Sequence, residues 1–307
     1  MTASIAGSPT CSRARCATSK RVLPVAEPRT VVFEVGPLRI VGDAYGDPAD
    51  RPVLLLHGGG QTRHAWGDTA AALADEGHHA VALDLRGHGD SSWDPEGDYG
   101  AEALARDVTS IAKHFPMRPA MVGASLGGLA ILLAQGEGPD PPASAVVLVD
   151  IAPRVEPRGV ERILGFMGAH PDGFATLEDA ADAVAAYIPH RPRPKDLNGL
   201  RKNLRLGPDG RYRWHWDPRM MRDGRPRATD NTARLEAAAR GLRVPTLLVR
   251  GRLSDVVSED GARAFLDLVP HARYVDVSGA GHMVAGDRND PFTDAVVRFL
   301  GEVERGG

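Results

Sequence analysis

The segment from Gly123 to Gly127 carries a serine at its centre and reads G-A-S-L-G. The pattern G-x-S-x-G, with an apolar run before it and an apolar helical segment after it, is typical of a sharp strand-to-helix turn that exposes the serine hydroxyl. The N-terminus of the following helix would favour negative charge that develops beside this hydroxyl. Ser125 is therefore the candidate nucleophile.

A serine hydroxyl is a weak nucleophile unless a nearby base takes its proton, and histidine is the usual base. The chain has 11 histidines, so a single one means little by itself. His282 differs because it follows the last predicted strand, residues 273–277, and small residues at positions 279–281 precede it. Such a loop can approach Ser125 closely, so we expect His282 to be the base.

Short, unbroken apolar runs alternate with helical segments along most of the chain, which predicts a mostly parallel sheet with helices on both faces. A turn at positions 36–37 separates two further strands, which predicts an antiparallel edge. The predicted strands are residues 31–35, 38–45, 53–56, 80–83, 120–122, 145–149, 246–249 and 273–277. The predicted helices are residues 66–76, 101–114, 126–135, 259–268 and 291–303.

Residues 153–235 break this alternation, and we interpret them as a mostly helical cap inserted over Ser125. Residues 30–152 and 236–307 would then form the core, and residues 1–29 a flexible tail. Trp214 and Trp216 either line the substrate pocket or anchor the cap to the core. Further candidates for apolar lining are Phe166, Met167, Met220 and Met221.

Two more motifs lie in the order and at the spacing of a known family. H-G-G-G at residues 57–60 follows an early strand, and D-L-R-G-H-G-D-S at residues 84–91 follows the next strand. Together with G-x-S-x-G, these motifs resemble the α/β-hydrolase fold superfamily over residues 31–303. The resemblance extends to its capped serine esterase, haloperoxidase-like and C–C-hydrolase-like branch, and it implies the α/β-hydrolase fold with a cap.

The resemblance implies a third catalytic member, an acid that orients His282 and stabilises its charged form. Asp255 follows the penultimate predicted strand, where the family usually keeps the acid, 27 residues before His282. Asp150 ends an earlier strand, a position that some relatives use. We predict that Asp255 is the acid and that Asp150 caps or anchors the entry to the insertion.

The resemblance also implies two backbone donors for the oxyanion, the N–H groups of Leu126 and Gly59. Gly60 could replace Gly59 as a donor or contact the substrate. His57 would support the structure of its loop. We likewise expect the motif at residues 84–91 to be a structural loop near the site.

These residues favour a serine hydrolase that cleaves a carboxylic ester, lactone or thioester through an acyl-enzyme. Cleavage of a C–C bond or perhydrolysis on the same triad is the alternative, because fold alone does not separate these reactions. A noncatalytic ligand-binding member of the fold is a minor alternative. A serine at position 125 argues against relatives that use an aspartate nucleophile.

Composition and charge exclude several other classes. The net charge of −3 gives no global reason to expect nucleic acid, and no run approaches the ~18 apolar residues of a membrane span. Neither a metal-binding pattern nor a dinucleotide motif is evident, so we expect no metal and no cofactor. Residues 191–230 carry a net charge of +7, which we interpret as a solvated surface, with attraction of anionic substrates as the alternative.

Cys11 and Cys16, the chain's two cysteines, both lie in the predicted tail, so no disulfide framework supports the core. The tail lacks the apolar run of a secretory signal. We therefore expect a cytoplasmic protein that acts on a small, ester-like molecule.

Overall fold

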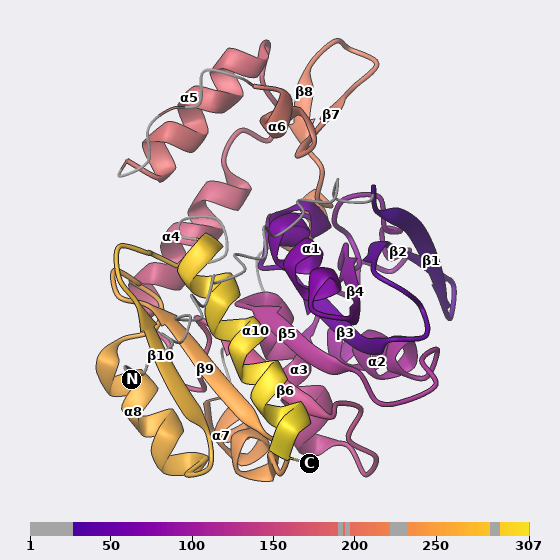
Figure 1. Ribbon diagram of the computed structural model, residues 1–307. Coiled ribbons are helices and arrows are strands. Elements are labelled where there is room, and N and C mark those ends of the chain that lie inside the picture. The colour runs from indigo at the N-terminus through magenta and orange to yellow at the C-terminus, as the bar shows by residue number, and fades with distance from the viewer. Residues whose placement is uncertain (1–26, 190–192, 194–196, 222–231, 283–288, 307) are drawn as a thin grey trace, which may run out of the picture.

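A computed structural model describes residues 27–189, 193, 197–221, 232–282 and 289–306. Its centre is an eight-stranded sheet with the order β1-β2-β4-β3-β5-β6-β9-β10 (Figure 1). The strands are β1 (Arg29–Val35), β2 (Leu38–Tyr45), β3 (Arg51–Leu56), β4 (His78–Leu83), β5 (Ala120–Ala124), β6 (Ala145–Val149), β9 (Thr246–Gly251) and β10 (Arg273–Val277). The strands from β4 to β10 in this order pair in parallel, whereas β2 pairs antiparallel with both β1 and β4. The predicted sheet and its antiparallel edge are therefore confirmed.

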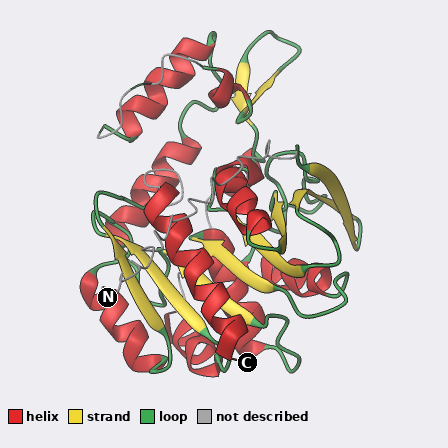
Figure 2. Cartoon of the chain, in the orientation of Figure 1, coloured by secondary structure: helices red, strands yellow, loops and turns green. Residues whose placement is uncertain are grey.

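Helices cover both faces of this sheet (Figure 2). Helices α2, α3, α7 and α8 pack against one another on one face, while α1 and α10 pack together on the other. These helices are α1 (Gly67–Asp75), α2 (Ala101–Ala112), α3 (Leu126–Glu137), α7 (Thr232–Gly241), α8 (Glu259–Leu268) and α10 (Asn289–Gly306). Short 3₁₀ segments are η1 (Arg63–Trp66) and η2 (Pro218–Met221).

The central strands are apolar at nearly every position because successive side chains enter two different cores. In β3, Leu54 and Leu56 belong to the core under α2 and α3, whereas Val53 and Leu55 belong to the core under α1 and α10. All four side chains are fully buried. The unbroken apolar runs in the sequence therefore reflect a sheet covered on both sides.

Residues 153–221 leave the sheet after β6 and form a separate group of elements. They comprise α4 (Pro157–Gly168), α5 (Leu177–Tyr187), α6 (Asn198–Arg201), β7 (Leu204–Leu206), β8 (Tyr212–Trp214) and η2. Figure 1 shows α5, α6, β7 and β8 together at one end of the molecule. The antiparallel pair β7–β8 departs from the mostly helical expectation, because a turn with Gly210 at a φ of 76° reverses the chain there.

The predicted tail at residues 1–29 lies outside the described residues except for its last three positions, of which Arg29 begins β1. Within the described part of the chain, no helix is both long enough and apolar enough to cross a bilayer.

Helices α3 and α7 approach so closely that their backbones touch through glycines. A Cβ atom placed on Gly136 of α3 would lie 2.1 Å from the carbonyl oxygen of Ala238 in α7. A Cβ atom on Gly241 would in turn lie 2.3 Å from the oxygen of Gly136. Because these neighbours are backbone atoms, a side chain there must push the two helices apart.

We therefore expect Gly136→Ala to lower the free energy of unfolding by about 1–3 kcal/mol, the usual cost of overpacking. Gly165→Ala in α4 is the matched control, because no atom lies within 4 Å of its Cβ position. The control should be neutral or more stable by up to about 1 kcal/mol, since alanine favours helix over glycine. Urea unfolding of the two variants tests this difference, and equal effects would contradict the close contact.

Candidate active site

Ser125 lies between β5 and α3 in a backbone conformation that non-glycine residues rarely adopt. Its φ is 45° and its ψ is −110°. Three backbone hydrogen bonds hold the turn: the Ser125 N–H donates to Val149 O at 3.0 Å, Leu129 N–H to Ser125 O at 2.9 Å, and Gly127 N–H to His57 O at 3.1 Å. Strained residues of this kind persist where the surroundings over-determine them, and they are frequent at functional sites.

Three glycines make this turn possible. A Cβ atom on Gly123 would lie 2.6 Å from the backbone of Gly127, and one on Gly128 would lie 2.6 Å from the oxygen of Gly123. A Cβ atom on Gly127 would lie 2.5 Å from the oxygen of Leu56, at the end of β3. The G-x-S-x-G pattern is therefore a packing requirement of the strand-to-helix turn.

The backbone N–H groups of the H-G-G-G loop separate into those already bonded and one that is not. Gly58 N–H donates to Gln61 Oε1 at 2.9 Å, and Gly60 N–H donates to His88 Nε2 at 3.2 Å. Within the described part of the chain, the N–H of Gly59 has no hydrogen-bond partner. Leu126 begins α3, where helical N–H groups have no partner within the helix.

His282 lies after β10 and forms a hydrogen bond with Asp150, the residue that directly follows β6. The distance from His282 Nδ1 to Asp150 Oδ2 is 2.7 Å. The Asp150 side chain is fully buried, and the His282 side chain is 7% exposed. A buried carboxylate on Nδ1 leaves the other ring nitrogen, Nε2, as the proton acceptor.

Two further donors hold the carboxylate of Asp150. Gly251 N–H donates to Oδ1 at 3.1 Å, and the Ser254 hydroxyl donates to Oδ2 at 2.5 Å. The Ser254 oxygen itself accepts from the N–H groups of Val256 and Val257, both at 3.1 Å. With its oxygen engaged by these two donors, Ser254 has its proton free to donate to Asp150.

The structure does not bring Asp255 to His282, which differs from the expectation that Asp255 orients this ring. The Asp255 carboxylate instead accepts from Arg162 Nε of α4 at 2.7 Å, and its side chain is 40% exposed. Arg162 also donates to Tyr187 O at 3.1 Å. The loop after β9 thus turns Ser254 toward Asp150 and turns its neighbour Asp255 outward toward the insertion.

Ser125 and His282 are not hydrogen-bonded to each other. Among the described residues, the Ser125 hydroxyl has no hydrogen-bond partner at all. The two residues nevertheless follow strands whose carboxyl ends lie at the same edge of the sheet, as do Asp150 and the loop of Gly59. That edge is where open α/β sheets commonly bind ligands.

Three buried histidines form a cluster behind the glycine loop. The ring centroids of His57 and His88 are 4.9 Å apart, and those of His88 and His215 are 5.8 Å apart. His57 Nδ1 donates to Gly58 O and its Nε2 accepts from Leu85 N–H; His88 Nδ1 donates to Arg86 O. Both nitrogens of each neutral ring are therefore used for structure.

Burial lowers the pKa of all three rings because the charged form would lose its hydration. The pKa of His57 falls to about 4, that of His88 to about 3 and that of His215 to about 2. His215 belongs to the insertion, accepts from Gly89 N–H at 2.7 Å and donates to Gly60 O at 3.4 Å. It therefore joins the insertion to the glycine loop, a contact that the sequence did not reveal.

The loop from Asp84 to Tyr99, here called the docking loop, forms further hydrogen bonds with the insertion. Arg205 donates to Gly89 O and to Asp90 Oδ1, both at 2.7 Å. Asp217 N–H donates to Gly87 O at 2.9 Å, and Arg219 donates to Asp94 O at 2.8 Å. The D-L-R-G-H-G-D-S motif is thus a structural loop, as expected.

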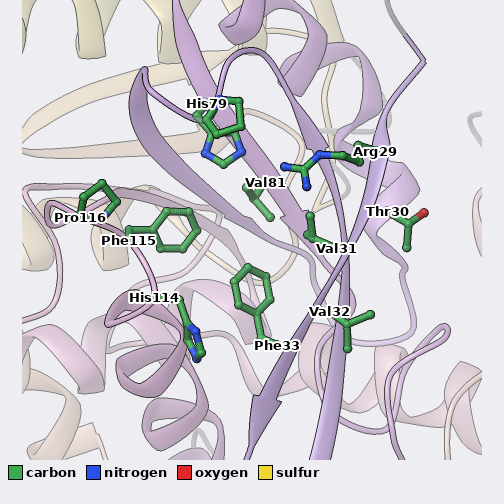
Figure 3. Close-up of a pocket in the computed structure, with 11 residues that line it drawn as sticks. Arg29, Thr30, Val31, Val32, Phe33, His79, Val81, His114, Phe115 and Pro116 are labelled. Atoms are coloured by element: carbon green, nitrogen blue, oxygen red, sulfur yellow. The ribbon is translucent and has the colours of Figure 1, made fainter.

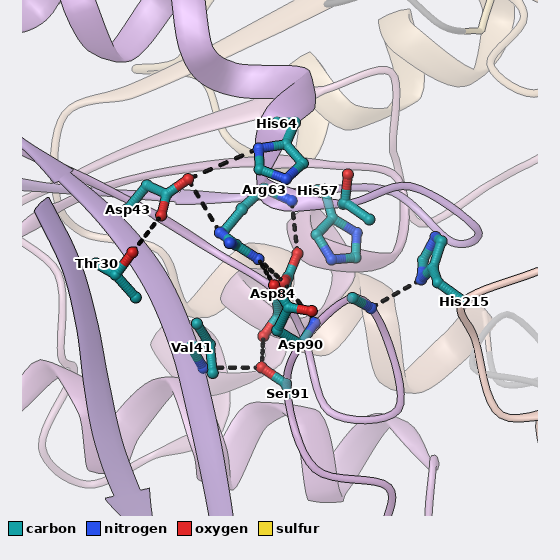
Figure 4. A network of polar contacts seen from close by, with 12 residues as sticks. Thr30, Val41, Asp43, His57, Arg63, His64, Asp84, Asp90, Ser91 and His215 are labelled. Atoms are coloured by element: carbon teal, nitrogen blue, oxygen red, sulfur yellow. Dashed lines mark hydrogen bonds and ion pairs between the residues drawn. The ribbon is translucent and has the colours of Figure 1, made fainter. Parts of the chain in front are cut away.

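A buried ionic network fixes the docking loop on the core (Figure 4). The guanidinium of Arg63 pairs with the carboxylates of Asp43, Asp84 and Asp90, and these carboxylates raise its pKa against the effect of burial. Ser91 closes the loop by donating to Asp84 O at 2.7 Å and accepting from Val41 N–H at 2.9 Å.

Trp214 and Trp216 stack on each other, with ring centroids 5.0 Å apart. Trp216 is 4% exposed and approaches the glycine loop: its Cζ3 atom lies 3.4 Å from the position of a Cβ on Gly60. Trp214 packs against the insertion's own apolar cluster around Phe174. The two tryptophans thus anchor the insertion, and Trp216 also reaches the candidate site.

A groove of about 610 Å³ lies at another edge of the sheet, between β1 and the end of α2 (Figure 3). Phe33, His79 and Phe115 are among its lining residues, and it contains none of the sequence-predicted site residues. Among the described residues, no group of three or more His, Cys, Asp and Glu side chains is arranged to hold a metal ion.

Comparisons with known proteins agree with this architecture. The family described as alpha/beta hydrolase fold matches residues 51–288. Esterase Rv0045c of Mycobacterium tuberculosis is 30% identical over 80% of this chain and 80% of its own length, and the 3-hydroxybutyrate-oligomer hydrolase of Cupriavidus necator is 29% identical over 80% and 87%. A solved structure of the M. tuberculosis esterase superposes on this chain with a TM-score of 0.71 and 26% sequence identity. The superposition covers 90% of this chain and 92% of the esterase chain.

The buried histidines predict that acid destabilises the fold. Their folded pKa values lie below the ordinary 6.5, so the unfolded chain binds protons that the folded chain does not. The free energy of unfolding is therefore highest above about pH 6.5, where these histidines are neutral in both states. It decreases as the pH falls from 6.5 toward the pKa values of the histidines in the folded chain. Each should contribute a slope of about 1.4 kcal/mol per pH unit near pH 5.

Urea unfolding from pH 7 to pH 5 measures this slope. His215→Asn should lower this slope by about 1.4 kcal/mol per pH unit, because one fewer proton is taken up on unfolding. The variant should also be less stable at pH 7, because Gly89 N–H and Gly60 O each lose a hydrogen bond. His114→Asn, at an exposed position, is the matched control for the substitution itself. An unchanged slope in His215→Asn would contradict a buried neutral ring.

Proposed function

The chain belongs to the α/β-hydrolase fold family, and on this premise we propose that it is a serine hydrolase that cleaves carboxylic esters, lactones or thioesters. The observation that carries the proposal is the left-handed backbone of Ser125 at the carboxyl end of β5. This conformation exposes a hydroxyl at the N-terminus of α3 at the expense of backbone strain.

In the proposed reaction, Ser125 attacks the carbonyl carbon while His282 Nε2 takes its proton and then gives it to the leaving alcohol. Water next cleaves the acyl-enzyme with His282 again as the base. Asp150 orients the ring of His282 and stabilises its charged form, in place of the expected Asp255. The 2.7 Å hydrogen bond between His282 and Asp150 supports this assignment. Hydrogen bonds between nucleophile and base commonly tighten only when substrate binds.

The N–H groups of Gly59 and Leu126 are the proposed oxyanion donors. Gly59 is favoured over Gly60 because the Gly60 N–H already donates to His88. Removing one such donor typically costs an enzyme about 10²–10³ in kcat, since preorganised donors need no rearrangement during the reaction. His88 and Gln61 therefore support the geometry of the loop by engaging the N–H groups on either side of Gly59.

The insertion is proposed to act as a cap that covers Ser125 and shields the site from bulk solvent. Its contacts with Gly60 through His215 and Trp216 support this role. The similarity to an esterase and to a 3-hydroxybutyrate-oligomer hydrolase favours small ester substrates. Ester cleavage is thus favoured over C–C bond cleavage or perhydrolysis.

A fluorophosphonate probe tests the nucleophile directly, because it reacts covalently with an activated serine. The wild-type chain should be labelled at Ser125 and should hydrolyse p-nitrophenyl esters. Ser125→Ala should lose the label and about 10⁴-fold or more in kcat while retaining its melting temperature, since triad members act as a unit. Near-normal esterase activity in Ser125→Ala would contradict the proposal.

The acid is tested by paired substitutions of nearly equal volume. Asp150→Asn should lower kcat by about 10³–10⁴-fold, because an amide cannot hold the productive tautomer or stabilise charged His282. Asp255→Asn is the matched control, and it should change kcat by less than about tenfold because its carboxylate pairs with Arg162. Kinetics and thermal melts of both variants decide; the reverse ranking of kcat would reassign the acid to Asp255.

A further inference from the structure

Met167, near the end of α4, reaches the loop that holds the proposed oxyanion donor. Its Sδ atom lies 3.5 Å from the positions that a Cβ would occupy on Gly59 and on Gly60. Its side chain is 6% exposed, although its helix neighbour Phe166 is only half-buried. Met167 therefore packs into the candidate site.

Three side chains converge beside the glycine loop. Cδ2 of Leu126 lies 4.0 Å from the Cβ position on Gly59, and Met167 Sδ lies 3.5 Å from the same position. Trp216 lies 3.4 Å from the Cβ position on Gly60, where Met167 Cγ lies at the same distance. Leu126, Met167 and Trp216 thus form an apolar wall beside the backbone that would hold the substrate's oxygen.

The order of strands tells which half of an ester meets this wall. Strand β5, which leads to Ser125, has β3 on one side and β6 on the other. The glycine loop follows β3, whereas Asp150 follows β6 and holds His282. The leaving alcohol must lie toward His282, which protonates it, and the carbonyl oxygen must lie on the N–H groups of Gly59 and Leu126. We therefore place the acyl group on the remaining side of the carbonyl carbon, away from His282 and beside the apolar wall.

We infer that Met167 closes the acyl subsite and restricts the enzyme to short acyl chains. This inference rests on the proposed function and deepens it by naming the substrate class. The apolar wall is also held in place. Trp216 stacks on Trp214, and the neighbouring His215 forms hydrogen bonds with Gly60 O and Gly89 N–H. A short acyl group fits beside Met167, whereas a longer one must displace this side chain.

Other cap methionines do not take this position. Met220 Cε lies 2.2 Å from the Cβ position on Gly87 and therefore packs on the docking loop. Met221 lies 3.9 Å from the Cβ position on Gly168, at the end of α4. Met220→Ala is consequently a matched control for Met167→Ala, since both remove the same atoms from the insertion.

The test is a series of p-nitrophenyl esters with acyl chains from two to ten carbons. The wild-type kcat/KM should fall as the chain lengthens beyond about four to six carbons. Met167→Ala should raise the ratio of kcat/KM for the eight-carbon ester to that for the acetate by about 10- to 50-fold, because space for a few buried methylene groups is opened. Met167→Val should shift the ratio in the same direction by less, and Met220→Ala should leave it unchanged.

A second series keeps the acyl group as acetate and varies the alcohol. Met167→Ala should leave the preference among p-nitrophenol, 1-naphthol and 4-methylumbelliferone unchanged. A change in alcohol preference without a change in acyl preference would overturn the assignment to the acyl side. An unchanged acyl profile in active variants that are labelled at Ser125 would overturn the inference alone, whereas absence of labelling in the wild-type chain would overturn the proposed function with it.

Discussion

The left-handed turn at Ser125 is the constraint on which much of the remaining structure depends. A serine at a φ of 45° is held because its neighbours leave no relaxed alternative. The adjoining segment must be glycine at position 127 to pass the end of β3, and the N–H of that glycine is bonded to His57 O. His57 in turn accepts from Leu85 N–H, so the turn at Ser125, the glycine loop and the docking loop form one continuous arrangement.

The elements and the strained turn at Ser125 were predictable from sequence because each leaves a local signature. Buried parallel strands appear as unbroken apolar runs, and the turn at Ser125 needs small residues at fixed positions. The predicted bounds of α8 match those of the structure. The pair β7–β8 was not predicted, because three-residue strands are too short to show alternation of polar and apolar residues. Gly210 alone does not indicate a hairpin.

The hydrogen bond between His282 and Asp150 was not predictable from the sequence. Asp150 and Asp255 both follow strands that end at the same edge of the sheet, so chain order alone does not tell which carboxylate faces the ring. Two features decide it: the left-handed φ of 49° at Asp150 and the direction of Ser254, whose hydroxyl meets Asp150. The role of His215 is similarly nonlocal, since its partners Gly60 and Gly89 lie far away along the chain.

The insertion is attached to the core on two sides, at the docking loop and at α4. Toward the docking loop it is held by buried groups such as His215 and Asp217. At α4, the backbone of Gly159 packs against Asp255 O and Glu156 N–H donates to Val256 O at 2.8 Å, while the 46% exposed Arg162 side chain pairs with Asp255. Exposed ion pairs contribute little and weaken with salt, while bonds among buried groups do not. Because buried contacts lie on both sides, the insertion is held against the core by interactions that salt does not screen, and the exposed pair of Arg162 with Asp255 adds little to them.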